Sequence, residues 1–134
     1  MPLAEVDVKR VQESYDRCAA HPGFFELFYD LLLASDPKIP PMFARTEFDK
    51  QHRLLKHAIG LLLIYGKRPN PALLERLATR HNRTNVNVDP SLYRHFVDSL
   101  VKAVKHHDTA FDADLERAWR AAVSPGIEYL QSQY

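Results

Sequence analysis

The sequence contains only one cysteine, Cys18, and it carries almost no net charge. A single cysteine excludes both an internal disulfide framework and a cysteine-type zinc site, and it suits a reducing compartment. The 18 basic and 17 acidic side chains leave a net charge of +1, without the basic excess that nucleic-acid-binding proteins usually carry. The low cysteine count argues against a disulfide-rich secreted domain, and the low net charge argues against a nucleic-acid partner.

Long apolar runs are missing as well. The longest, Leu61–Tyr65, is far too short to span a membrane, and Met1–Arg10 has no apolar core of signal-peptide length. We therefore expect a cytoplasmic protein with no membrane partner. With 134 residues, 46% of them hydrophobic and 26% charged, the sequence is expected to form a single domain over residues 1–134.

Every long segment has the hydrophobic period of a helix, and none alternates convincingly like a strand. The pattern predicts six substantial helices and one short turn of helix. In chain order they cover about 7–20, 24–35, 38–43, 47–65, 70–81, 89–107 and 112 onward. An all-helical domain of this size could be a bundle or a globin-type packing, and helix lengths alone leave both open.

Several residues are expected to begin, end or bend these helices. Asn70, Asp89 and Asp112 are predicted N-caps, the first two followed by a proline at the first helical position. Gly66 is expected to cap the end of the long helix that starts near residue 47. Pro125, followed by a glycine, is expected to kink or interrupt the last helix.

His81 ends an apolar stripe of the helix predicted over 70–81, after Leu74, Leu77 and Ala78. A histidine in such a place is more often a core residue than a metal ligand. An imidazole that projects from an apolar face is, however, what a haem iron needs on its proximal side. A backbone carbonyl near the helix end could orient its second nitrogen.

Gln51 leads an otherwise apolar stripe of the long helix, which continues through Leu55, Ala58 and Leu62. It is either a boundary residue or a hydrogen-bonding side chain at the mouth of an apolar pocket. His52 is the competing candidate for that second role. Because its face runs through Lys56 and is half solvated, we rank it lower and expect it to point away from the pocket.

Tyr29 and Phe43 each have an ordinary interpretation and a functional one. Helical spacing puts Tyr29 beside Phe25 and Leu32, so it could be a core tyrosine or a hydroxyl donor aimed into the same pocket as Gln51. Phe43 ends the proline-rich corner and is, taken alone, an ordinary core aromatic.

Single residues of this kind are weak evidence, whereas their order and spacing along the chain are specific. The short motifs that carry this order are Phe28-Tyr29, Asp36-Pro37, Pro41-Met42-Phe43, Lys50-Gln51, Leu54-Leu55, Leu77-Ala78-Thr79-Arg80-His81, Val88-Asp89-Pro90-Ser91-Leu92-Tyr93 and Glu116-Arg117-Ala118-Trp119. Together they cover nearly the whole chain. The ordered set resembles the bacterial single-domain globins and the globin domain of flavohaemoglobins.

The resemblance implies an all-α globin fold, with about six to eight helices that sandwich one haem b. It implies that His81 is the proximal ligand of the iron, and therefore the metal-binding residue. Tyr29 and Gln51 match the paired distal hydrogen-bond donors, and Phe43 matches the aromatic that wedges against the haem. The remaining residues implied to line the pocket are Leu55, Leu77, Val88, Tyr93, Phe96 and Leu100.

Two features depart from the family pattern. The interval between His81 and Tyr93 is about two residues longer than usual, so the loop there is atypical. Flavohaemoglobins also place a glutamate late in the last helix, where it joins the tyrosine and the proximal histidine. This chain has Tyr134 at the matching distance, and Glu128 comes too early. The electron-rich, peroxidase-like histidine that the glutamate provides is therefore in doubt.

The remaining basic residues receive more ordinary interpretations. Arg53, Arg80 and Arg83 flank the expected pocket and could meet the haem propionates, since arginine pairs well with carboxylates. The other histidines are not expected to bind metal. They are His21, His57, His95, His106 and His107.

The resemblance implies reversible binding of dioxygen and of other diatomic gases such as NO and CO. A nitric oxide dioxygenase activity is a further option, and it would need an external reductase because the chain has no flavin or nicotinamide domain. Two alternatives stay open: a haem-based gas or redox sensor that signals to a partner, and a haem-free globin-fold interaction module. The sequence also leaves open whether the protein is a monomer or a homodimer.

Overall fold

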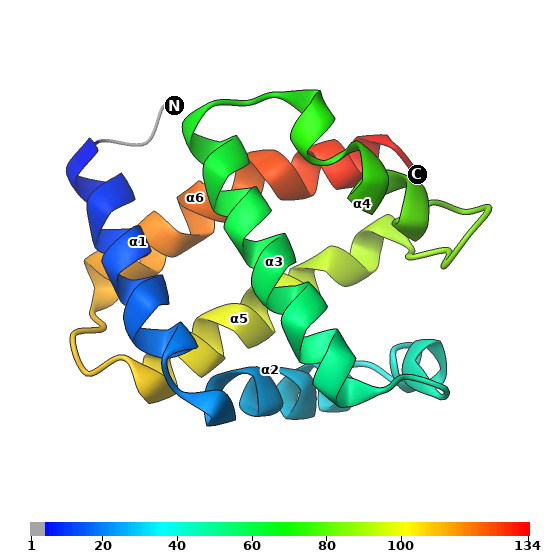
Figure 1. The fold of residues 1–134 in the computed structure, drawn as a ribbon, viewed down its shortest axis with the longest axis horizontal. Helices are drawn as coiled ribbons and strands as arrows, with labels where there is room; N and C mark the ends of the chain where they lie inside the picture. The colour runs from blue at the N-terminus through cyan, green and yellow to red at the C-terminus, as the bar shows by residue number, and fades with distance from the viewer. Residues whose placement is uncertain (1–4) are drawn as a thin grey trace.

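The computed structural model describes residues 5–134, and within that range it contains α-helices and short 3₁₀ turns but no strand. The helices are α1 (Glu5–Ala19), α2 (Pro22–Ser35), α3 (Phe48–Lys67), α4 (Glu75–His81), α5 (Tyr93–His107) and α6 (Ala113–Ser132) (Figure 1). The 3₁₀ turns η1, η2 and η3 are Pro40–Phe43, Pro71–Leu73 and Pro90–Leu92. The all-helical prediction is confirmed. The expectation that Met1–Arg10 contains no signal peptide falls partly on residues 1–4, outside the described residues.

The three predicted N-caps are confirmed by their hydrogen bonds. Each side-chain oxygen accepts a hydrogen bond from a backbone N–H two or three residues further on: Asn70 from Ala72, Asp89 from Ser91 and Asp112 from Leu115. Asp112 opens α6 as expected. Asn70 and Asp89 instead open the 3₁₀ turns, so α4 and α5 begin at Glu75 and Tyr93, later than the sequence pattern predicts.

Two expected helix ends are wrong: α3 does not end at Gly66, and α6 is not interrupted at Pro125. α3 runs through Gly66 to Lys67, and a Cβ atom at Gly66 would overlap the carbonyl oxygen of Ala122 on α6. Gly66 therefore allows α3 and α6 to cross closely, and it does not end α3. α6 likewise continues through Pro125 without interruption, because it is packed against α1, α3, α4 and α5 along its length.

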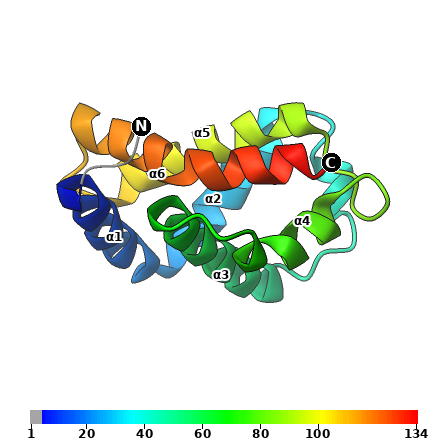
Figure 2. The same cartoon turned by 90° about the horizontal axis from the view of Figure 1, so that it is seen from above.

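The helices form two layers. α3 packs most extensively against α6, and α2 against α5. Seen from above, α3 and α4 lie on one side and α5 and α6 on the other (Figure 2). The most deeply buried large side chains include Phe24, Phe28, Ile59 and Trp119. No helix within residues 5–134 is both long enough and apolar enough to cross a membrane.

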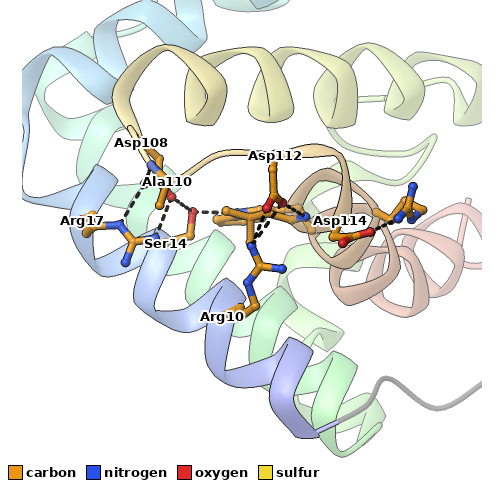
Figure 3. A network of polar contacts seen from close by, with 10 residues as sticks. Arg10, Ser14, Arg17, Asp108, Ala110, Asp112 and Asp114 are labelled. Atoms are coloured by element: carbon orange, nitrogen blue, oxygen red, sulfur yellow. Dashed lines mark hydrogen bonds and ion pairs between the residues drawn. The ribbon is translucent and has the colours of Figure 1, made fainter.

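A buried polar network joins α1 to the loop between α5 and α6 (Figure 3). Arg17 donates two hydrogen bonds of 2.9 Å to the Asp108 carboxylate. Ser14 Oγ donates to the same carboxylate at 2.6 Å and accepts a hydrogen bond from Trp119 Nε1 at 3.0 Å. The network thus ties three elements together at the end of the molecule where α1 lies.

The charge of Asp108 is compensated by these partners. Burial alone would raise the pKa of this carboxyl, but the hydrogen bonds from Arg17, Ser14 and the Ala110 N–H outweigh burial and lower the pKa below its usual value. A carboxyl whose pKa is lower in the folded state stabilises the fold above its unfolded pKa. That stabilisation is lost as the pH falls through the folded pKa.

We expect Asp108→Asn to lower the free energy of unfolding by about 2 kcal/mol at pH 7, because it removes the charge that Arg17 and Ser14 bind. Urea unfolding of the wild type and the variant measures the loss. The difference should shrink as the pH falls below the usual carboxyl pKa and through the lower pKa of Asp108, where the wild-type carboxyl also becomes neutral. Asp114→Asn is the matched control, since Asp114 pairs with Arg117 on the exposed surface of α6. A difference that stays constant down to low pH would contradict this account.

Candidate functional site

The structure contains a cavity of about 860 Å³ between the two helical layers. This volume lies toward the upper end of the range for small-molecule sites. Residues of α2, α3, α4, α5, α6 and all three 3₁₀ turns line it, and most of them are aliphatic or aromatic. A cavity with such walls fits a large and mainly apolar ligand.

His81 lies at the last position of α4, and its side chain lines this cavity. Its Nδ1 lies 2.7 Å from the carbonyl oxygen of Leu77, one helical turn earlier. This contact assigns the ring proton to Nδ1 and leaves the Nε2 lone pair free. Burial lowers the pKa of His81 below its ordinary value, even though the bond to Leu77 acts in the opposite direction. The imidazole is therefore neutral at pH 7 and able to donate its lone pair to a metal.

Tyr29 and Gln51 reach the same cavity from α2 and α3. The Gln51 side-chain amide donates a hydrogen bond of 3.0 Å to the Tyr29 hydroxyl oxygen. The Tyr29 proton remains available for a second acceptor. Burial raises the pKa of Tyr29 to about 12, so the hydroxyl stays protonated at neutral pH. The cavity therefore contains a hydroxyl donor that the Gln51 amide polarises, in a wall that is mainly apolar.

The other predicted pocket residues lie in the cavity wall, with one exception. Those that line it are Phe43, Leu55, Leu77, Val88, Tyr93 and Phe96. Burial raises the pKa of Tyr93 to about 12, so its hydroxyl is also neutral. Leu100 instead lies fully buried in the core of the protein. It is one helical turn beyond Phe96 on α5, about 6 Å farther along the axis, and this distance takes it away from the cavity.

His52 is not among the residues that line the cavity, as expected. It is half-buried, which agrees with the half-solvated face that the sequence suggests, and it also lies against aromatic rings. Its ring is stacked on Tyr29, with centroids 5.6 Å apart and planes at 11°. The sequence pattern misses this contact because it forms between two helices.

Three basic side chains and the carboxyl of Glu75 lie at the solvent-exposed edge of the cavity. Arg80 lines it as expected, together with Arg76 and His57, which sequence reasoning missed as pocket residues. All three are exposed to solvent. Arg76 and Arg80 are four residues apart on α4 and therefore share a helix face. This spacing could have identified Arg76 from the sequence. Arg53 does not line the cavity.

Arg83 and Tyr134 form a separate contact beside the loop that follows His81. The Arg83 guanidinium lies 4.8 Å from the centre of the Tyr134 ring, and its Nε donates a hydrogen bond to the Tyr134 main-chain oxygen. The Tyr134 hydroxyl donates to Asn87, which has a positive φ of 59°. The atypical loop is therefore attached to the end of α6, and Arg83 points to that contact and not to the cavity.

The remaining histidines lie outside the cavity, apart from His57 at its edge. His107, at the end of α5, contacts both His21 and His106, and His95 lies 3.5 Å from the Asp36 carboxylate. Within residues 5–134, no three histidine, cysteine or acidic side chains are grouped so that they could hold a metal ion.

These features define what the site can hold. The cavity offers the neutral His81 imidazole on an apolar wall, the protonated hydroxyls of Tyr29 and Tyr93, and a basic edge. They suit a flat apolar cofactor that carries a metal at its centre and carboxylates at its rim.

Comparisons with known proteins agree with this geometry. The family model described as Globin matches residues 26–127. Among solved structures, the chain is similar to a Pseudomonas aeruginosa protein described as structurally highly homologous to a human hemoglobin. The two are 38% identical and superpose with a TM-score of 0.92 over 96% of this chain and 98% of the other. No curated protein matches the chain. The likeness to flavohaemoglobins stays a prediction.

Proposed function

The chain belongs to the globin family, a family of haem proteins, and on that premise we propose that its haem is haem b with His81 as the proximal ligand. We further propose that the protein binds dioxygen reversibly, and NO and CO in the same place. The observation that carries the proposal is the neutral His81 imidazole, which lines the same cavity as the Tyr29–Gln51 pair.

Haem supplies an iron with one open coordination position for a diatomic gas when a single histidine ligates it. The Leu77 carbonyl fixes the orientation of the His81 ring through Nδ1, so that Nε2 is the ligating atom. A carbonyl is a weaker acceptor than a carboxylate. We therefore propose a proximal histidine of ordinary, not peroxidase-like, basicity.

Tyr29 is the proposed donor to the bound gas. Because its oxygen accepts a hydrogen bond from Gln51, its own O–H is polarised and directed elsewhere in the cavity. A gas that gains negative charge on binding accepts this hydrogen bond and is released more slowly. Gln51 thus acts mainly through Tyr29, while Leu55 and Phe43 keep the surroundings apolar.

The basic edge formed by Arg76, Arg80 and His57 is proposed to pair with the carboxylates of the cofactor. Arginine binds carboxylates through two parallel hydrogen bonds, which fixes orientation as well as charge. The prediction that Arg53 and Arg83 do this is not supported, since Arg83 contacts Tyr134.

Slow gas release suits scavenging or nitric oxide dioxygenation better than bulk oxygen transport. The Tyr29–Gln51 hydrogen bond favours nitric oxide dioxygenation as an extension of dioxygen binding. Its electrons would come from an external reductase. The haem-free alternative fits the site poorly, because an apolar cavity of about 860 Å³ without an occupant would leave much apolar surface uncovered.

A haem titration of the purified protein tests the proposal. We expect one haem per chain, with an intense absorption band that saturates at that ratio and shifts when CO is added to the reduced protein. A protein that folds but takes up no haem would contradict the proposal and would favour the interaction module.

A further inference from the structure

His52 touches the proposed gas-binding machinery from outside the cavity. Tyr29 has four aromatic neighbours, and three of them meet its ring at steep angles: Phe28 at 81°, Phe43 at 64° and Phe48 at 73°. Among the described residues, His52 is the only ring parallel to Tyr29, with planes at 11°. Because the two planes are parallel, a tilt of the Tyr29 ring would bring it against the His52 ring.

α3 holds Tyr29 at two points through consecutive residues. His52 stacks on the ring, and Gln51 donates a hydrogen bond of 3.0 Å to the hydroxyl. Consecutive side chains of a helix point about 100° apart, so one helical turn reaches both a face and the tip of the same tyrosine. The two contacts fix both the tilt of the ring and the place of its oxygen.

The His52 ring is itself fixed by further aromatic contacts. It lies 6.4 Å from Phe25 on α2 and 6.4 Å from Phe48 in the first turn of α3, measured between ring centres. Phe25 is buried, and His52 and Phe48 are half-buried. Offset-stacked and edge-to-face pairs of this kind have preferred geometries, so the cluster restrains where His52 can lie.

We propose that His52 is a positioning residue that sets the direction of the Tyr29 hydroxyl and, through it, the rate at which the protein releases dioxygen. This inference rests on the proposed function of Tyr29. His52 itself neither binds the gas nor lines the cavity. What matters in this role is a flat ring at position 52, not a titratable one.

The test compares His52→Leu, which removes the flat ring, with His52→Phe, which keeps it. His106→Leu is the matched control, because His106 is an exposed histidine that does not line the cavity. For each protein we would measure the dioxygen and CO dissociation rates and the C–O stretching frequency of the CO form. That frequency reports the hydrogen bond from Tyr29 and would not respond to a purely structural loss of stability.

We expect His52→Leu to quicken dioxygen release by about three- to tenfold, with little change in CO release. The C–O frequency should move toward that of Tyr29→Phe. His52→Phe should restore both values to near those of the wild type. When Tyr29 is already phenylalanine, His52→Leu should have no further effect, because the hydroxyl that it positions is gone.

Two results would overturn the inference while the proposed function stands. In the first, Tyr29→Phe releases dioxygen faster than the wild type, but His52→Leu releases it at the wild-type rate. The other is an equal effect of His52→Leu with and without the Tyr29 hydroxyl. If Tyr29→Phe alone changes nothing, the distal role of Tyr29 is wrong and the inference falls with it.

Discussion

The His81→Ala variant is expected to be purified largely free of haem. The substitution removes the proposed protein bond to the iron and leaves the apolar cavity wall in place. Loss of a residue that merely orients a metal ligand typically costs about 10–100-fold in metal affinity, so loss of the ligand itself should cost about 100-fold or more. Haem content per chain and the rate of haem transfer to an excess of another apoglobin measure the effect.

Free imidazole supplies a sharper version of the same experiment. It can enter the space left by the His81 ring and ligate the iron, so we expect added imidazole to restore haem binding to His81→Ala. His106→Ala, which changes an exposed histidine outside the cavity, should keep its haem without imidazole. Full haem occupancy of His81→Ala with an unchanged ferrous spectrum would show that another residue ligates the iron.

The Tyr29→Phe variant is expected to release dioxygen about tenfold faster than the wild type or more. The change removes a hydroxyl but almost no volume. A hydrogen bond of about 1–2 kcal/mol is lost, and about 1.4 kcal/mol corresponds to a factor of ten. CO carries less charge when bound, so its release should change much less. Dissociation rates of both gases, measured on the same preparations, test this expectation.

Gln51→Leu should act through the same hydroxyl. Because the Gln51 amide donates to the Tyr29 oxygen, its removal should quicken dioxygen release, but only while Tyr29 is present. The effects of the two single variants should therefore not add in the double variant. Unchanged dioxygen release in Tyr29→Phe would show that the distal assignment is wrong, even if His81 ligates the iron.

Helix boundaries could be predicted from the sequence where local chemistry decides them. Asp112 begins α6 because its side chain caps the first turn, and this needs no information from distant residues. Gly66 shows the opposite case. A glycine near the end of a helical pattern suggests a C-cap, but here it allows α3 to approach the backbone of α6, and no local pattern reveals that crossing.

In the candidate site as well, contacts within one helix could be predicted from the sequence, whereas contacts between helices could not. The sequence predicts that a backbone carbonyl near the helix end could orient the His81 imidazole, and in the structure the Leu77 carbonyl makes this contact. The stack of His52 on Tyr29 joins α3 to α2, and the Ser14–Asp108 bond spans 94 positions of sequence. Such contacts depend on how helices pack against one another. A sequence without its fold therefore gives no sign of them.

Resonance Raman spectroscopy of the reduced, gas-free protein tests whether His81 ligates the iron, because it detects the bond between iron and histidine. We expect a five-coordinate haem with an iron–histidine stretching band that shifts when the histidines carry ¹⁵N. In His81→Ala supplied with unlabelled imidazole, a band should return but no longer respond to the label in the protein. A six-coordinate spectrum without this band, or a label-sensitive band that survives His81→Ala, would contradict the assignment of His81 as the proximal ligand.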